Sequence, residues 1–273
     1  MNRLLENKVA IVTGAARGIG YASVELLLSC GGRVLMTDVD SDALGKAFTC
    51  LSKGDDELAA LTGDVTDPEF PKKAVEAALE RFQGLDIVIN NAGYPWPSPL
   101  HDMTEEQWHA ILDCHLTAPF QLIRAASGVL LDAAKKEKAA GGARSRKIVN
   151  VSSLAGTRGL AGAANYAAAK AGLVGLTKSL AREWAPYNIQ ANAVAFGQIA
   201  TRLTGSVEDG VKIQRNNTEI PLGIPSQGRK LWSEMHPMGR PGTAQEAAGV
   251  ILFFASPLSD YVSGQVLEVT GGI

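Results

Sequence analysis

The chain has 273 residues, of which 46% are hydrophobic and 20% are charged, and its formal net charge is −2. This size and composition suit a globular protein with a full core, and the small negative charge argues against nucleic-acid or membrane-surface partners. The start lacks the apolar segment of a signal peptide, and no apolar run reaches the roughly 18 residues of a membrane span. The three cysteines and four histidines lack metal-ligand spacing. We therefore expect a cytoplasmic protein without a bound metal.

Short apolar runs alternate with longer helical patterns along the whole chain. The expected strands are Lys8–Thr13, Arg33–Thr37, Leu58–Gly63, Leu85–Asn90, Lys147–Val151, Ile189–Ala195 and Gln265–Thr270. The expected helices are Gly18–Cys30, Ser41–Ser52, Pro68–Phe82, Thr104–Lys136, Ala163–Tyr187 and Thr243–Ala255. Because most strands are apolar on both faces, they indicate a parallel sheet covered by helices. The sequence predicts an α/β fold with a doubly wound parallel sheet in a single domain over residues 1–273.

Two segments depart from this alternation. Residues 135–147 are basic around Gly141 and Gly142, and we interpret them as a solvated helix end and an exposed turn, with an electrostatic docking patch as the alternative. Residues 202–236 are weakly periodic and contain Pro221 and Pro225. Because long irregular segments inside compact domains are often functional, we expect a substrate lid there.

A glycine-rich turn follows the first strand and opens the first helix, with glycines at 14, 18 and 20. Such a turn lets the backbone approach a pyrophosphate, which the free N–H groups of the helix N-terminus then bind. Asp38 ends the next strand, where a carboxylate can accept both adenosine-ribose hydroxyls and repel a 2′-phosphate. Asp38 therefore favours NAD, although it could also be a solvated loop carboxylate. Arg17 could meet a 2′-phosphate, so NADP is the alternative.

Tyr166 lies four residues before Lys170, so the two side chains share one helical face. A nearby ammonium favours the phenolate and can lower the tyrosine pKa from its usual value of about 10. This pair can act as a general acid or base near neutral pH. Ser153 lies upstream of the tyrosine and completes the candidate catalytic residues.

With the glycine motif, Asp38, Ser153, Tyr166 and Lys170 in this order, the chain resembles the short-chain dehydrogenase/reductase family from Lys8 to Gly272. The 3-oxoacyl-[acyl-carrier-protein] reductase type is the most similar subgroup. Further segments that match are Asn90–Gly93, Pro237–Arg240 and Ser263–Val266. The resemblance implies a Rossmann fold and an oxidoreductase that transfers hydride between nicotinamide C4 and a carbonyl or secondary alcohol. It also implies a homotetramer built through the long helices.

The family implies a role for each matching residue. Tyr166 would exchange the proton with the substrate oxygen, Lys170 would lower the tyrosine pKa and hold the nicotinamide ribose, and Ser153 would bind the substrate oxygen. Ser152, its neighbour, is expected to point elsewhere. The implied cofactor-binding residues are Gly14, Arg17, Gly18, Ile19, Gly20, Asp38, Asp64, Val65, Asn91, Ala92, Gly93, Tyr166, Lys170, Ile199 and Thr201.

Two positions differ from the family pattern. His115 stands where most members have an asparagine that helps a proton reach the lysine. It could carry the proton itself, or it could be a packed, hydrogen-bonded histidine. Phe196 replaces a proline after the sixth strand, which adds an aromatic ring near the nicotinamide.

The expected substrate pocket is mostly apolar and aromatic. The residues expected to line it are Tyr94–Trp96, Ser153, Leu154, Leu160, Phe196 and Trp232. Any of these side chains could instead belong to the hydrophobic core. Such walls favour an uncharged or amphipathic substrate, such as a 3-oxoacyl thioester. Arg202 and Arg215 could meet the phosphates of an acyl carrier, but we expect solvated loop charges. The alternatives are a dehydrogenase of a sterol, sugar alcohol or other secondary alcohol, and a non-catalytic NAD-binding sensor or scaffold.

Overall fold

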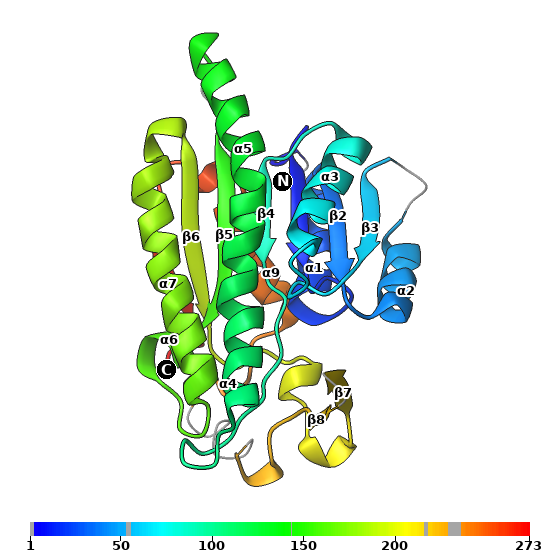
Figure 1. Ribbon diagram of the computed structural model, residues 1–273, viewed down its shortest axis with the longest axis vertical. Helices are drawn as coiled ribbons and strands as arrows, with labels where there is room; N and C mark the ends of the chain where they lie inside the picture. The colour runs from blue at the N-terminus through cyan, green and yellow to red at the C-terminus, as the bar shows by residue number, and fades with distance from the viewer. Residues whose placement is uncertain (1–2, 53–55, 143, 216–217, 229–235) are drawn as a thin grey trace.

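A seven-stranded sheet forms the centre of the protein (Figure 1). The computed structural model describes residues 3–52, 56–142, 144–215, 218–228 and 236–273. In the order β3-β2-β1-β4-β5-β6-β9, every neighbouring pair is parallel. The strands are β1 Val9–Thr13, β2 Arg33–Asp38, β3 Leu58–Thr62, β4 Ile87–Asn90, β5 Arg146–Ser153, β6 Ile189–Phe196 and β9 Val266–Val269. The predicted doubly wound sheet and single domain are confirmed.

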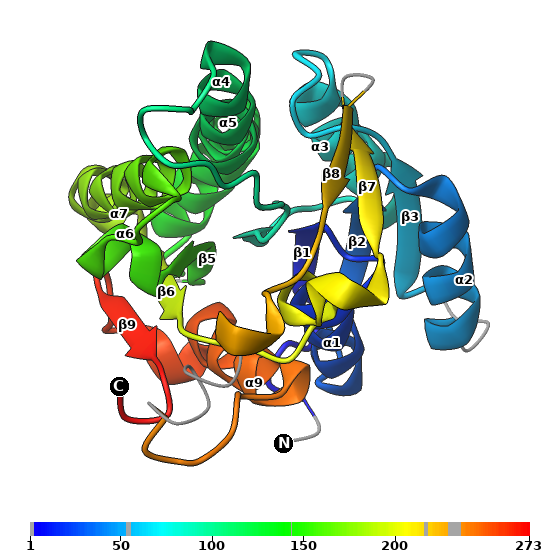
Figure 2. The same ribbon diagram turned by 90° about the horizontal axis from the view of Figure 1, so that it is seen from below.

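Helices cover both faces of the sheet (Figure 2). One face carries α1 Gly18–Ser29, α2 Ser41–Leu51 and α9 Ala244–Ala255, and the other carries α3 Phe70–Phe82, α5 Ala118–Ala139 and α7 Ala164–Trp184. Alternate residues of β1 enter opposite cores: Val12 packs with the first helix layer and Ile11 with the second. This two-sided burial explains why the strands are apolar throughout. None of the described helices is long and apolar enough to cross a membrane.

The strand order reverses between β1 and β4. From β1 the chain runs outward to β2 and β3, and it returns to β4 on the other side before continuing to β5 and β6. In open parallel sheets, ligands bind in the crevice at the carboxyl ends of the strands where the order reverses. Thr13 and Asn90, the last residues of β1 and β4, mark that crevice here.

The helix predicted over Thr104–Lys136 contains a π-helical interruption. It consists of α4 Glu105–Leu112, a π-helical segment Asp113–Thr117 and α5. Proline lacks an N–H and its ring clashes with the carbonyl four residues earlier, so Pro119 cannot bond to His115. The Ala118 N–H bonds five residues back to Asp113 instead. The wider turn leaves Cys114 and His115 buried.

An antiparallel hairpin, β7 Lys212–Arg215 and β8 Thr218–Pro221, occupies part of the irregular segment. It lies below the sheet in Figure 1 and in front of the ends of β1 and β2 in Figure 2. Ile220 is 1% exposed and packs in a cluster with Tyr94 and Ile111. The hairpin is therefore attached to the carboxyl edge of the sheet through a small core of its own.

The basic segment is not simply a solvated turn, so that interpretation was wrong for its last residues. Arg146 and Lys147 begin β5 and are 3% and 2% exposed. Arg146 forms two bonds of 2.9 and 2.8 Å with Glu137, and Lys147 lies 2.7 Å from Asp260. Buried charges require such partners. The strand expected from Lys147 begins one residue earlier, at Arg146, and the charges of its first two residues are paired at the amino end of the sheet.

Candidate active site

Ser153, Tyr166 and Lys170 meet at the carboxyl end of β5. Ser153 is the last residue of β5 and the N-cap of α6, Leu154–Arg158, while Tyr166 and Lys170 lie one turn apart on α7. The Ser153 side chain interacts with the Tyr166 phenol and accepts the Ala155 N–H at 3.2 Å. The Lys170 Nζ donates to the Val151 carbonyl oxygen at 2.6 Å and lies 5.7 Å from the Tyr166 ring centroid. Ser152 bonds the Lys170 carbonyl oxygen at 3.1 Å instead, as predicted.

Burial governs the protonation of this group. It raises the pKa of Tyr166, a shift that the bond from Ser153 opposes, and it lowers the pKa of Lys170 to about 8. The expectation that Lys170 lowers the tyrosine pKa is therefore not met in the chain alone, because desolvation of the phenol dominates. At neutral pH the phenol carries its proton, which is the form required to donate to a carbonyl oxygen.

His115 is buried beside the tyrosine. Its ring meets the Tyr166 ring edge-on with centroids 4.9 Å apart, and its Nε2 is 2.8 Å from the Tyr94 carbonyl oxygen. Burial, aided by the charge of Lys170, holds the pKa of His115 well below its usual value, so the imidazole is neutral. The Tyr94 N–H also lies 3.2 Å from the same nitrogen, so Nε2 faces both a donor and an acceptor of one peptide segment. The Nδ1 has no hydrogen-bond partner among the described residues.

The glycine turn and the segment after β4 fit against each other. A Cβ on Gly20 would lie 2.2 Å from the Gly14 carbonyl oxygen, so only glycine permits this approach. The Asn91 side-chain nitrogen donates to the carbonyl oxygens of Thr13 and Gly14 at 2.9 and 3.0 Å. Arg17, the N-cap of α1, gives the helix no side-chain bond. The turn and open helix N-terminus fit a pyrophosphate, so the residues present suit a dinucleotide.

Asp38 is anchored as the last residue of β2 and is partly buried, so it does not lie in a loop. Its two oxygens accept the N–H groups of Ala16 and Asp40, both at 3.1 Å. The carboxylate thus connects the glycine turn to the start of α2, beside the expected ribose position. Arg17 pairs with Asp40 at 2.7 Å. Arg202, expected to be a solvated loop charge, is exposed as predicted, and it lies within electrostatic range of Arg17, Asp38 and Asp40.

The other implied cofactor residues border the same crevice. Thr201 lies against Gly18, where a Cβ would be 3.4 Å from its methyl group, and Ile199 is buried beneath. Ile19 packs on the core from the first turn of α1. Asp64 accepts two bonds from Thr66.

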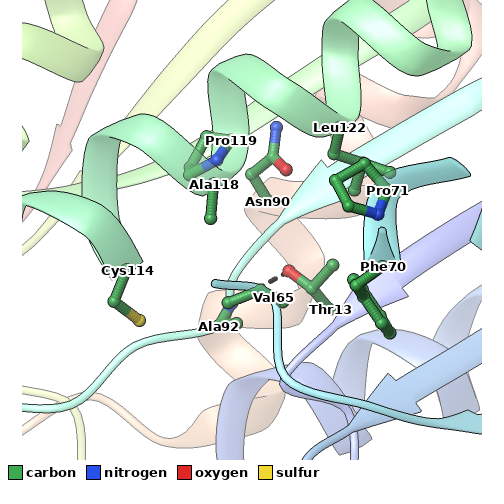
Figure 3. Close-up of a pocket in the computed structure, with 10 residues that line it drawn as sticks. All are labelled: Thr13, Val65, Phe70, Pro71, Asn90, Ala92, Cys114, Ala118, Pro119 and Leu122. Carbon is green, nitrogen blue, oxygen red and sulfur yellow. Dashed lines mark hydrogen bonds between the residues drawn. The ribbon is translucent and has the colours of Figure 1, made fainter. Parts of the chain in front are cut away.

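A small cavity lies next to this crevice. Figure 3 shows Val65, Ala92 and Cys114 around it, with the Ala92 N–H bonded to the Thr13 hydroxyl at 3.0 Å. Gly93 follows, and a Cβ there would lie 2.1 Å from His115 Cε1. The glycine therefore makes the room that the imidazole occupies.

The predicted substrate walls are only partly brought together. Trp96 packs in the cluster that contains Tyr166, and Asn165 fixes it by donating to the Trp96 carbonyl oxygen at 3.1 Å. Leu154 follows Ser153, and Leu160 is 43% exposed. Phe196 was assigned wrongly: it is 5% exposed and belongs to the core beneath the sheet, because the last position of β6 faces α1 and α9. Trp232 lies outside the described residues.

Sequence reasoning missed the contribution of the hairpin and of Asp40. Ile213 and Ile220 pack on the cluster around Tyr166, and the Arg215 guanidinium lies 5.2 Å from the Tyr94 ring centroid. The isoleucines alternate with polar residues in each strand, a pattern too short to distinguish from a loop. Asp40 could have been found as a helix N-cap, since Ser, Thr, Asp and Asn favour that place.

Comparisons with known proteins agree with this geometry. A family model described as enoyl-(acyl carrier protein) reductase matches residues 14–273. The chain is 39% identical to 3-oxoacyl-[acyl-carrier-protein] reductase FabG of Vibrio cholerae serotype O1 over 269 residues, which is 98% of each protein. It is 35% identical to the protein of the same name from Chlamydia muridarum over 274 residues, which is 100% of each.

A solved structure extends the comparison to three dimensions. It is described as a short-chain dehydrogenase/reductase SDR, glucose/ribitol dehydrogenase, from Brucella melitensis. It matches with a TM-score of 0.84 and 28% identity, over 100% of this chain and 98% of that chain. The chain belongs to the short-chain dehydrogenase/reductase family and is an oxidoreductase that acts on alcohol or carbonyl groups.

Proposed function

We propose that the protein is an NAD(H)-dependent reductase of a 3-oxoacyl thioester or a similar apolar carbonyl compound. The observation that carries the proposal is the meeting of Ser153, Tyr166 and Lys170 beside the glycine turn. The thioester comes from the names of the FabG relatives, and the apolar surroundings of Tyr166 support it. A scaffold that only binds the cofactor would not need this catalytic trio.

Each residue has a defined task in this proposal. Ser153 hydrogen-bonds the substrate oxygen, Tyr166 donates its proton to that oxygen, and Lys170 keeps a positive charge close to the phenol. The bound nicotinamide supplies the hydride. Because burial raises the pKa of Tyr166, the protein holds the proton donor ready at neutral pH, and the reverse oxidation needs a higher pH.

We also propose that the described part of the 202–236 segment, which contains the β7–β8 hairpin, covers the substrate. The β7–β8 hairpin is seated on the site through Ile220, which is 1% exposed, and through the stacking of Arg215 on Tyr94. Trp96 and Leu154 are the walls nearest the tyrosine and serine in this arrangement.

The function is tested by measuring NADH and NADPH oxidation with a panel of carbonyl compounds that includes acetoacetyl-CoA. Reduction of the thioester with NADH supports the proposal. A secondary alcohol dehydrogenase is the second candidate, because the Brucella melitensis relative is described as a glucose/ribitol dehydrogenase. NAD reduction with sugar alcohols or sterols, without thioester reduction, would favour that candidate. No turnover despite cofactor binding would favour a sensor or scaffold.

The pH dependence of carbonyl reduction should report Lys170. Its pKa is lowered to about 8 by burial, so the ammonium is present below that pH and is lost above it. We expect kcat to fall by about tenfold per pH unit above about pH 8. The control is Lys178→Ala, which removes an exposed lysine from the same helix and should leave the profile unchanged. A profile without this alkaline fall would contradict the role of the ammonium.

His115 either relays protons or only packs, and we propose the relay. Its neutral ring has an unpartnered Nδ1 beside Tyr166 and near Lys170. His115→Ala should lower kcat and change its pH profile, whereas His115→Asn, the residue usual in the family, should restore much of the activity. Thermal unfolding measures the loss of packing separately. Unchanged turnover and an unchanged profile in His115→Ala would eliminate the relay.

We further propose a homotetramer assembled through the long helices, in the cytoplasm. On α5, Phe120 is 43% exposed with the Arg124 guanidinium 5.2 Å from its ring centroid. Large exposed aromatic rings are favoured at interfaces between subunits. This supports contact through α5, while the location rests on the sequence composition.

A further inference from the structure

The cation nearest the expected ribose position is already paired. Arg17 precedes Gly18 in the glycine turn, and its Nη2 donates to Asp40 Oδ2 at 2.7 Å. Asp38, which marks the adenosine ribose in folds of this type, binds the N–H groups of Asp40 and of Ala16, the residue before Arg17. A 2′-phosphate would have to enter this small group of charges.

Asp40 is held in place independently of Arg17. Its Oδ1 accepts the Ala43 N–H at 3.0 Å, which makes it the N-cap of α2. The Ala43 bond and, after it, the bond from Arg17 lower the pKa of Asp40, so the carboxylate is ionised at all physiological pH values. The N-terminus of α2 therefore holds the Asp40 carboxylate in place, and this negative charge forms an ion pair with the Arg17 guanidinium.

Arginine beside the ribose is the usual means of accepting the 2′-phosphate of NADP. Here the bound carboxylate neutralises that arginine and adds repulsion of its own. We infer that Asp40 is a specificity-determining residue, which holds Arg17 in an ion pair and so makes the site favour NAD(H) over NADP(H). The inference rests on the proposed function, because it requires the nicotinamide cofactor to bind in this crevice.

The lid segment supplies a second cation to the same place. Arg202 follows Thr201 and is within electrostatic range of Arg17, Asp38 and Asp40. With the Asp40 charge removed, Arg17 and Arg202 would both be able to turn toward a 2′-phosphate. Removing the Asp40 charge would therefore leave Asp38 as the carboxylate that opposes a 2′-phosphate, with two arginines available to bind it.

The test compares the Kd values of NADH and NADPH for the wild type and Asp40→Asn, measured by quenching of protein fluorescence. Asparagine keeps an oxygen for the Ala43 N–H and removes only the charge. We expect the Kd of NADPH to fall by about tenfold, which corresponds to about 1.4 kcal/mol. The Kd of NADH should change by less than about twofold, because Asp38 remains in place.

Two further variants make the test specific. Asp42→Asn removes the same charge from an exposed position in the first turn of α2, and the ratio of the two Kd values should not change. Arg17→Gln added to Asp40→Asn should cancel the gain for NADPH. Thermal unfolding checks that all variants are folded.

The outcomes separate this inference from the proposed function. A wild type that binds neither dinucleotide would refute both. A wild type that binds NADH, with the same Kd ratio in Asp40→Asn, would overturn the inference and leave the function standing. An equal fall in the Kd of NADPH in Asp42→Asn would also overturn the inference. The net negative charge near the site, and not the Arg17–Asp40 ion pair, would then determine the preference for NAD(H).

Discussion

Replacing Tyr166 with phenylalanine is expected to lower kcat for carbonyl reduction by about 10²- to 10⁴-fold, the range for loss of a general acid. The variant keeps the aromatic ring that meets His115 edge-on at a 4.9 Å centroid distance, and it loses the phenol that bonds Ser153. The protein should therefore fold, and the Kd of NADH should stay within a few-fold of the wild type. Steady-state kinetics and cofactor titration on the same preparation measure the two quantities.

The control for this variant is Tyr187→Phe. Tyr187 stacks with Lys135 far from the site, with the Nζ 5.9 Å from the ring centroid, and its hydroxyl has no part in the proposed chemistry. Its kcat should equal that of the wild type. If Tyr166→Phe retains turnover within about tenfold, another group supplies the proton and the assignment of the general acid fails.

The fold and the central site could be predicted because their signals are local and periodic. Strands buried on both faces are apolar throughout, as in β1 and β4, and the glycine turn stands between a strand and a helix. Tyr166 and Lys170 are one helical turn apart, so their shared face follows from the sequence alone. That Ser153 lies close to Tyr166 and Lys170 was predicted from the family resemblance, because no local pattern in the sequence indicates this contact between β5 and α7.

What could not be predicted depends on contacts between distant segments. The ion pair of Arg17 and Asp40 joins the glycine turn to the start of α2, and no periodic pattern in the sequence predicts this ion pair. The π-helical turn is caused by Pro119. A proline inside a helical pattern can also kink the helix or end it, so the sequence alone does not predict which of these occurs. The direction of the Tyr166 pKa depends on how deeply the phenol is buried, which the sequence does not express.

The basic segment illustrates the same limit at the opposite edge of the sheet. Its charges suggested solvation, yet Arg146 and Lys147 are buried at the start of β5. Arg146 pairs with Glu137 from the helical start of the same segment, and Lys147 pairs with Asp260 from a distant part of the chain. Charge composition describes a segment correctly only where its charges have no partner elsewhere in the fold.

The largest loss of stability should come from Asp86, which is 5% exposed just before β4. Its Oδ2 accepts the Val9 N–H and the Arg144 guanidinium, each at 3.0 Å, and its Oδ1 is 3.9 Å from Lys8. Removing one partner of a buried ion pair leaves the other charge uncompensated and typically costs about 3–5 kcal/mol. We expect Asp86→Ala to lower the free energy of unfolding by that amount, measured by urea denaturation. Faster hydrogen exchange of the Val9 amide should accompany the loss.

The loss should also depend on pH in a defined direction. Burial lowers the pKa of Lys8 to about 8, and Asp86 opposes that shift. Below that pH the lysine is charged and needs the carboxylate, whereas above it the neutral amine does not. The cost of Asp86→Ala should therefore be greater near about pH 7 than near about pH 10.

Asp132→Ala gives the matched control. Asp132 forms an exposed ion pair with Lys135 at 3.7 Å, and the two side chains are 69% and 57% exposed. Removing such a pair should change stability by no more than about 1 kcal/mol. If Asp86→Ala lowers the free energy of unfolding no more than this surface variant does, water stabilises the charges of the cations around Asp86 without the carboxylate. The stability of the amino edge of the sheet then does not depend on Asp86. An equal cost at both pH values would instead assign the loss to the Val9 bond and Arg144, since Lys8 is the partner of Asp86 whose pKa lies in that interval.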